Sequence, residues 1–194
     1  MTALITAVLA FGALTGCTGT TTNGSPTTAG STGAQETGST PTSSDESPSG
    51  MSIEKYVNAP CDTLKSDQVT TLGTVQPGVV AAAAGGLGQK CTWRGQDVIK
   101  NSTYTVVVTK DKDFDSRVDG VKSNGVFAEK KIDDVRVVST DGTDATMYCL
   151  TMFPTSKTDS VTVQIATAAD ERATKKPCDE TERVAQLIIT NLKG

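Results

Sequence analysis

The chain has 194 residues, with 18 basic and 22 acidic side chains, a formal net charge of −4 and no histidine. The missing histidine excludes Ser-His-Asp and Cys-His catalytic sites and histidine-based metal centres. Proteins that bind nucleic acid usually carry a strongly positive surface, whereas the net charge of this chain is small and negative. We therefore expect no nucleic-acid partner.

The first 17 residues have the features of a lipoprotein signal. An uncharged apolar run ends in LTGC at residues 14–17, a lipobox in which small residues precede a cysteine that is acylated before cleavage. The run of about 14 residues fits a signal peptide and is too short to span a membrane. We predict a signal peptide over residues 1–16 and a lipid anchor, with palmitate among its chains, on Cys17. No Lys or Arg precedes the run, and a start upstream of Met1 would supply the usual positive segment.

The segment between Cys17 and residue 50 consists mainly of Thr, Ser, Gly and Pro, without aromatic residues, Leu, Ile or Val. Such a segment buries too little apolar surface to offset the entropy lost on ordering. We therefore expect residues 17–50 to be the lipidated cysteine and a disordered tether. Its root-mean-square reach is on the order of 30 Å, which holds the next domain away from the membrane.

Residues 51–194 have the pattern of a single extracytoplasmic α+β domain. Strand patterns follow one another, with helix patterns at both ends. This order predicts an antiparallel sheet of about five strands with helices packed on it and two disulfides. We expect helices at 66–72, 114–121 and about 179–192, and a loop at 75–88. The expected strands are 91–94, 103–109, 126–132 as a bent or paired unit with 135–139, 146–153 and 160–167.

The C-terminal helix is the clearest element. Val184, Leu187, Ile188 and Leu192 recur at helical spacing and share one face. Acidic residues at 179, 180 and 182 lie in its first turns, where the helix dipole favours negative charge. This pattern predicts that the helix packs its apolar face on the sheet.

The chain contains five cysteines. Lipidation of Cys17 would leave an even set of four in an oxidising compartment, where disulfides are expected. Zinc is the competing use, but the chain has neither a CxxC spacing nor a histidine, so we expect no metal and no other cofactor. Pairing each helix start with a strand joins Cys61 to Cys91 and Cys149 to Cys178, which is one of three possible connectivities.

Residues around these cysteines resemble a family of actinobacterial lipoproteins grouped as domain of unknown function 3558. The resemblance covers most of residues 59–192, although the family's Gly-rich step before the third cysteine reads DDVR at residues 133–136 here. It implies a cell-surface lipoprotein with two disulfides and supplies no activity. The residues that carry it are Ala59, Pro60, Cys61, Asp62, Leu64, Val69, Leu72, Gly73, Cys91, Thr92, Trp93, Pro177, Cys178 and Ala185.

Carboxylates are the remaining candidates for catalysis. Two of them, set as in a glycosidase, could act on cell-wall polymers. Acidic residues beside turns are usually solvated, so we expect no catalytic residue here. The pattern at 111–115 also resembles the start of a calcium loop, but Ser116 and Lys122 replace its glycine and glutamate. The candidate acids are Asp111, Asp113, Asp115, Asp133 and Asp134.

Two other features could contact a ligand or partner. Trp93, Tyr104 and Phe127 could line a groove, but large aromatic side chains near a disulfide favour the core. The segment 79–87 is apolar, small and flexible, as in a partner-binding loop. We name Val79, Val80 and Leu87 as its possible contact residues.

These features predict a lipid-anchored domain on the extracytoplasmic face of the cell membrane. We expect it to bind a protein partner or an amphiphile. The alternatives are a wall-active hydrolase that uses a carboxylate pair and a structural accessory of the envelope. A deep apolar cavity would favour the amphiphile, converging acids the hydrolase, and a closed core with an exposed apolar patch a protein partner.

Overall fold

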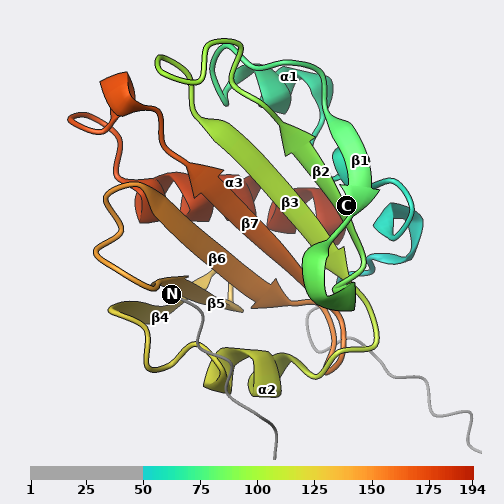
Figure 1. The fold of residues 1–194 in the computed structure, drawn as a ribbon. Coiled ribbons are helices and arrows are strands. Elements are labelled where there is room, and N and C mark those ends of the chain that lie inside the picture. The colour runs from blue at the N-terminus through green and yellow to red at the C-terminus, as the bar shows by residue number, and fades with distance from the viewer. Residues whose placement is uncertain (1–49) are drawn as a thin grey trace, which may run out of the picture. The chain divides into compact units, whose positions relative to one another are not determined.

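Figure 1 shows the structure, a computed structural model that describes residues 50–194. The expected signal peptide, Cys17 and all but the last residue of the expected tether lie outside the described residues. Residue Met51, where the expected domain begins, is already buried, with 2% of its surface exposed.

Seven strands form one antiparallel sheet in the order β1-β2-β3-β7-β6-β5-β4 (Figure 1). The expected antiparallel sheet is therefore present, but the expected number of about five strands is wrong. The described fold is mostly β, with few helices. The strands are β1 (Val79–Ala82), β2 (Gln89–Trp93), β3 (Thr103–Thr109), β4 (Val126–Ile132), β5 (Val135–Asp141), β6 (Tyr148–Pro154) and β7 (Ser160–Ala166).

The two additional strands have separate causes. The unit expected over residues 126–139 is a hairpin of two full strands, because Asp133 and Asp134 adopt left-handed backbone angles, with φ of 49° and 64°. Two such residues form the tight turn that matches the twist of a hairpin. The expected loop at 75–88 contains β1, which pairs with β2 through Val79 opposite Thr92.

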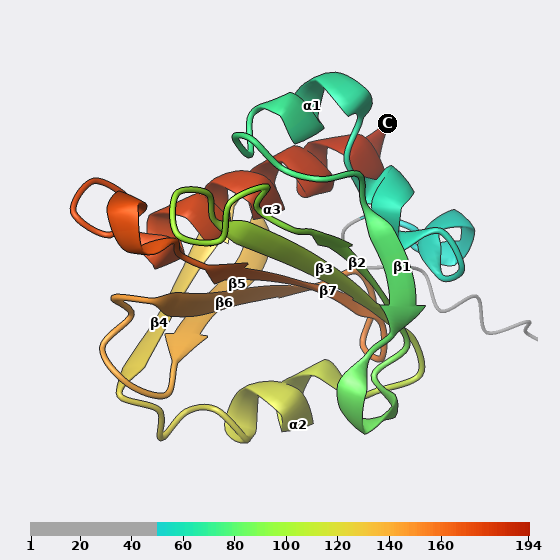
Figure 2. The same cartoon turned by 45° about the horizontal axis from the view of Figure 1, so that its top comes forward.

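Helices cover both faces of the sheet unequally. In Figure 2, α3 lies along one face and the short α2 lies under the other. No helix in residues 50–194 is long and apolar enough to cross a membrane. The helices are α1 (Ser66–Thr70), α2 (Phe114–Asp119) and α3 (Pro177–Lys193), and the short 3-10 turns are η1 (Glu54–Tyr56), η2 (Pro60–Thr63), η3 (Ala84–Gly86) and η4 (Ala169–Glu171).

The main core lies between α3 and the sheet. Val184 and Ile188 are fully buried as expected, whereas Leu187 is only partly buried, at the margin of the core. Ala185 and Ile189 are also fully buried, so the buried face of α3 is broader than the expected apolar stripe. A second, smaller cluster under α2 consists of Phe114, Val118, Val138 and Met152.

Candidate functional site

Two disulfides attach helical segments to the sheet. Cys61 on η2 is bonded to Cys91 on β2, and Cys149 on β6 is bonded to Cys178 at the start of α3. These are the two pairs that we predict from the sequence. Bonded sulfurs are not available as thiolates, and each bridge links a helical segment to a strand of the sheet.

Strand β1 forms one edge of the sheet, and its side chains are exposed. Val79 exposes 64% of its surface and Val80 exposes 46%. Within residues 50–194, only β2 pairs with β1. Two residues of the expected partner segment therefore lie on an open strand edge rather than in a loop, while Leu87 follows η3 and is partly buried.

The backbone of β1 alternates between bonding to β2 and facing outward. Ala83 donates its N–H to the carbonyl oxygen of Gly88 at 2.8 Å, which identifies these opposite residues as a hydrogen-bonded pair. Pairs in an antiparallel ladder alternate, so Val79 and Ala81 also bond to β2. The N–H and C=O groups of Val80 and Ala82 consequently point away from the sheet.

The opposite edge of the sheet is protected. Strand β4 exposes Glu129, Lys130 and Lys131, and Lys130 forms an ion pair with Glu182 of α3. Charged side chains on an edge discourage pairing with another strand. Residues 75–89 next to and within β1 carry no charge at all. The sheet thus has one charged edge and one uncharged edge.

The candidate acids occupy separate structural positions. Asp113 accepts the N–H of Ser116 at 2.8 Å as the N-cap of α2, and this hydrogen bond lowers the pKa of the Asp113 carboxyl. Asp115 is exposed and pairs with Arg136 at 2.5 Å. Asp111 has a left-handed backbone, and the remaining two acids, Asp133 and Asp134, form the β4–β5 turn.

No metal site is evident among these residues. Within residues 50–194, no group of three or more histidine, cysteine, aspartate or glutamate side chains could hold a metal ion. The candidate acids lie in turns, at a helix cap and in an ion pair.

The three candidate aromatic side chains do not meet in a groove. Trp93 and Tyr104 lie opposite each other on β2 and β3 and are buried in the main core. Phe127 packs instead against the smaller cluster under α2. The first two side chains therefore belong to the core, as the sequence analysis favours.

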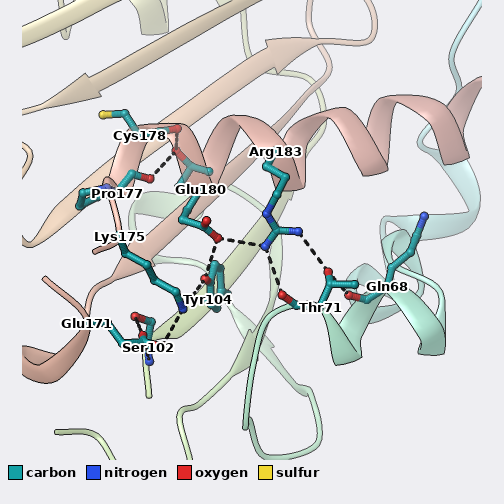
Figure 3. A network of polar contacts seen from close by, with 11 residues as sticks. Gln68, Thr71, Ser102, Tyr104, Glu171, Lys175, Pro177, Cys178, Glu180 and Arg183 are labelled. Carbon is teal, nitrogen blue, oxygen red and sulfur yellow. Dashed lines mark hydrogen bonds and ion pairs between the residues drawn. The ribbon is translucent and has the colours of Figure 1, made fainter. Parts of the chain in front are cut away.

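Tyr104 is also the centre of a polar network that no pattern in the sequence predicts (Figure 3). Its hydroxyl donates to Glu180 at 3.2 Å and lies 3.4 Å from the Lys175 amine. Lys175 pairs with Glu171 at 2.8 Å, and Glu171 accepts hydrogen bonds from the backbone and hydroxyl of Ser102. The network thus connects β3 with η4 and the first turn of α3.

The environment of Tyr104 keeps its hydroxyl protonated. Burial raises the pKa of this phenol most strongly, and the nearby carboxylate of Glu180 raises it further. A phenol of this kind is a poor general base at neutral pH. Arg183 extends the network from Glu180, at 3.0 Å, to the hydroxyl of Thr71 after α1, at 3.1 Å. The network therefore links the end of α1 and the start of α3 to strand β3 by hydrogen bonds and ion pairs.

Comparison with known proteins identifies a family but no activity. The family model described as "Protein of unknown function (DUF3558)" matches residues 12–191. No curated protein and no solved structure matches the chain.

Proposed function

Because the chain belongs to the DUF3558 family of proteins of unknown function, we propose a function from its own residues: a lipid-anchored binding module of an actinobacterial cell envelope. A lipid on Cys17 holds it to the extracytoplasmic face of the membrane, and residues 18–50 act as its tether. The domain acts by contact with a protein partner rather than by turnover of a substrate.

The open edge of β1 is the single observation that carries the binding role. Its outward N–H and C=O groups, at Val80 and Ala82, match the backbone of an extended segment. A strand added to a sheet edge gains main-chain hydrogen bonds and places alternate side chains against the two faces. We therefore propose that an uncharged, extended segment of a partner protein pairs with β1.

A protein partner suits this edge better than an amphiphile does. The exposed backbone groups need hydrogen-bond partners, and an acyl chain has none to offer. The exposed valines at positions 79 and 80 supply apolar contact on either side of the added strand. The absence of charge along residues 75–89 removes the repulsion that normally protects such an edge.

Ala82→Pro tests this proposal. Proline lacks an N–H, and at position 82 the lost N–H is the one that faces away from β2. The change should leave the β1–β2 ladder and the thermal unfolding temperature nearly unchanged. Ala82→Ser is the matched control, because it keeps the N–H. In a strain that lacks the protein, Ala82→Ser should restore normal function and Ala82→Pro should not.

Two other outcomes would contradict the proposal. Full restoration by a folded Ala82→Pro, Val80→Lys double variant would exclude strand addition at β1. Normal function of that variant together with a folded but inactive Asp→Asn variant would favour a carboxylate hydrolase. The variants to compare are Asp111→Asn, Asp113→Asn, Asp115→Asn, Asp133→Asn and Asp134→Asn.

A further inference from the structure

The sheet carries a pocket on the face opposite α3. Strand register places Thr105, Gln164, Leu150 and Thr140 in one row across β3, β7, β6 and β5. The helix α2 lies under this face (Figure 2) and packs on Val138 and Met152 beside this row. Together with a second row that includes Tyr148, this row lines a pocket of about 320 Å³. This volume is at the lower end of small-molecule sites, which run from roughly 300 to 1,000 Å³.

The pocket walls combine polar and apolar groups and carry almost no charge. Hydroxyl and amide side chains lie beside the apolar Leu150 and Ala166, and no Lys or Arg of residues 50–194 lines the site. Asp141 is the one carboxylate among residues 50–194 that lines the pocket, and it accepts the N–H groups of Thr143 and Ala145 at 3.0 Å each. Partial burial raises the pKa of Asp141, but these bonds and that of the Thr143 hydroxyl outweigh it and lower the pKa overall. Within residues 50–194, the lining therefore provides no cationic side chain that could pair with an anionic ligand.

Two side chains of the pocket are free to meet a ligand. The amide of Gln164 is exposed in the middle of the sheet and has no hydrogen-bond partner in the described part of the chain. An amide both donates and accepts, as ligand hydroxyls do. Tyr148 begins β6 beside it and exposes 53% of its surface, so its ring and its phenol hydroxyl are both accessible. An exposed aromatic ring beside uncommitted hydrogen-bonding groups suits a ligand that is polar at its edge and apolar on its face.

We propose that this pocket binds an uncharged carbohydrate. A sugar ring presents C–H groups that stack on Tyr148 and hydroxyls that bond to Gln164 and to the carboxylate of Asp141. An acyl chain would leave these polar groups unpaired, and an acidic ligand would meet a carboxylate without a compensating cation. The site is separate from the β1 edge, so the proposal does not depend on strand addition there.

Titration followed by NMR tests the pocket. The full chain with Cys17→Ser, labelled with ¹⁵N, is titrated with uncharged di- and trisaccharides of glucose, galactose, arabinose and N-acetylglucosamine, and separately with decanoate. At least one saccharide should shift the amide signals of Thr105, Tyr148 and Gln164 in a saturable way. Gln164→Leu and Tyr148→Ala should each weaken that binding about tenfold, since each removes one contact. Both sites are on the surface, so thermal unfolding should not change.

Gln76→Leu is the matched control, because Gln76 is an exposed glutamine outside this pocket. It should bind as the parent chain does. The proposal is overturned if no saccharide shifts these signals, if decanoate alone does so, or if the shifts lie elsewhere and are unaffected by Gln164→Leu. Loss of binding in Gln164→Leu with normal behaviour of Ala82→Pro would uphold the pocket and reject strand addition, so the two proposals fail separately.

Discussion

Gly78 lies directly against Trp93 at the entry to β1. A β carbon at position 78 would stand 2.8 Å from Nε1 of the indole and 2.7 Å from Sγ of Cys91. Separations below 3.0 Å require something to move, and here the neighbours are a buried ring and a disulfide. Only glycine therefore lets the chain pass over the Cys61 to Cys91 bridge and continue into the edge strand.

Gly78→Ala should destabilise the domain by about 1 to 3 kcal/mol, the usual cost of overpacking a core. Urea unfolding measures this loss, and faster hydrogen exchange at Ala81 would show that β1 has moved away from β2. Gly142→Ala is the control, because a β carbon there meets no atom within 4 Å. Equal stability of the two variants would mean that the crowding around position 78 does not exist in solution.

Loss of the bridge between Cys149 and Cys178 should be costly. The paired change of both residues to Ala removes a link between β6 and the start of α3, whose Cα atoms lie 5.1 Å apart. Deleting a native disulfide from a small exported domain costs about 2 to 5 kcal/mol. Chemical unfolding under oxidising conditions measures the loss, and non-reducing peptide mapping of the parent chain checks the pairing. Free thiols or other pairs would contradict the described topology.

Acid should weaken the network at Glu171. Burial raises the pKa of this carboxyl, but the hydrogen bonds from Lys175 and Ser102 outweigh that effect, so its folded pKa lies below its ordinary value. The contribution of such a carboxyl to the unfolding free energy is fully present above its pKa in the unfolded chain, about 4.3. It is lost as the pH falls through its lower pKa in the folded protein.

Glu171→Gln should therefore cost about 1 kcal/mol at pH 7, and the deficit relative to the parent chain should shrink as pH falls below about 4. Unfolding free energies measured between pH 3 and pH 7 give this dependence. Glu54→Gln is the control, since Glu54 pairs with Lys110 at an exposed site where an ion pair contributes little. A deficit in Glu171→Gln that stays constant at every pH would show that its charge does not matter.

Local patterns predict part of this fold and non-local pairing determines the rest. The C-terminal helix and the strand at 103–109 are evident from spacing and β-branched residues alone. Strand β1 is missed because Ala81 and Ala82 have little strand preference of their own and become extended by pairing with β2. The uncharged run at 75–89 is the sequence signal that accompanies this open edge, where we propose that a partner binds.

The Tyr104 network and the pocket depend on contacts between residues that lie far apart in the sequence. Ser102 and Glu171 are 69 positions apart in the chain, and Tyr104 and Glu180 are 76 apart. The row that brings Thr105, Gln164 and Leu150 together follows from strand order and register. A single sequence contains no periodicity that reports either relationship, which is why the network and the pocket emerge only from the fold.

Cys17→Ser should release the protein from the membrane. An acyl chain contributes about 0.8 kcal/mol for each buried methylene, and two anchoring signals together give stable attachment. Lipidation at this position would require the thiol, which serine lacks. The variant should therefore be found in the soluble fraction after carbonate extraction of the membranes. Thr15→Ser keeps the cysteine and a small hydroxyl residue before it, and should remain with the membrane. Retention of Cys17→Ser on the membrane would show that another segment anchors the chain and that Cys17 is not its lipidation site.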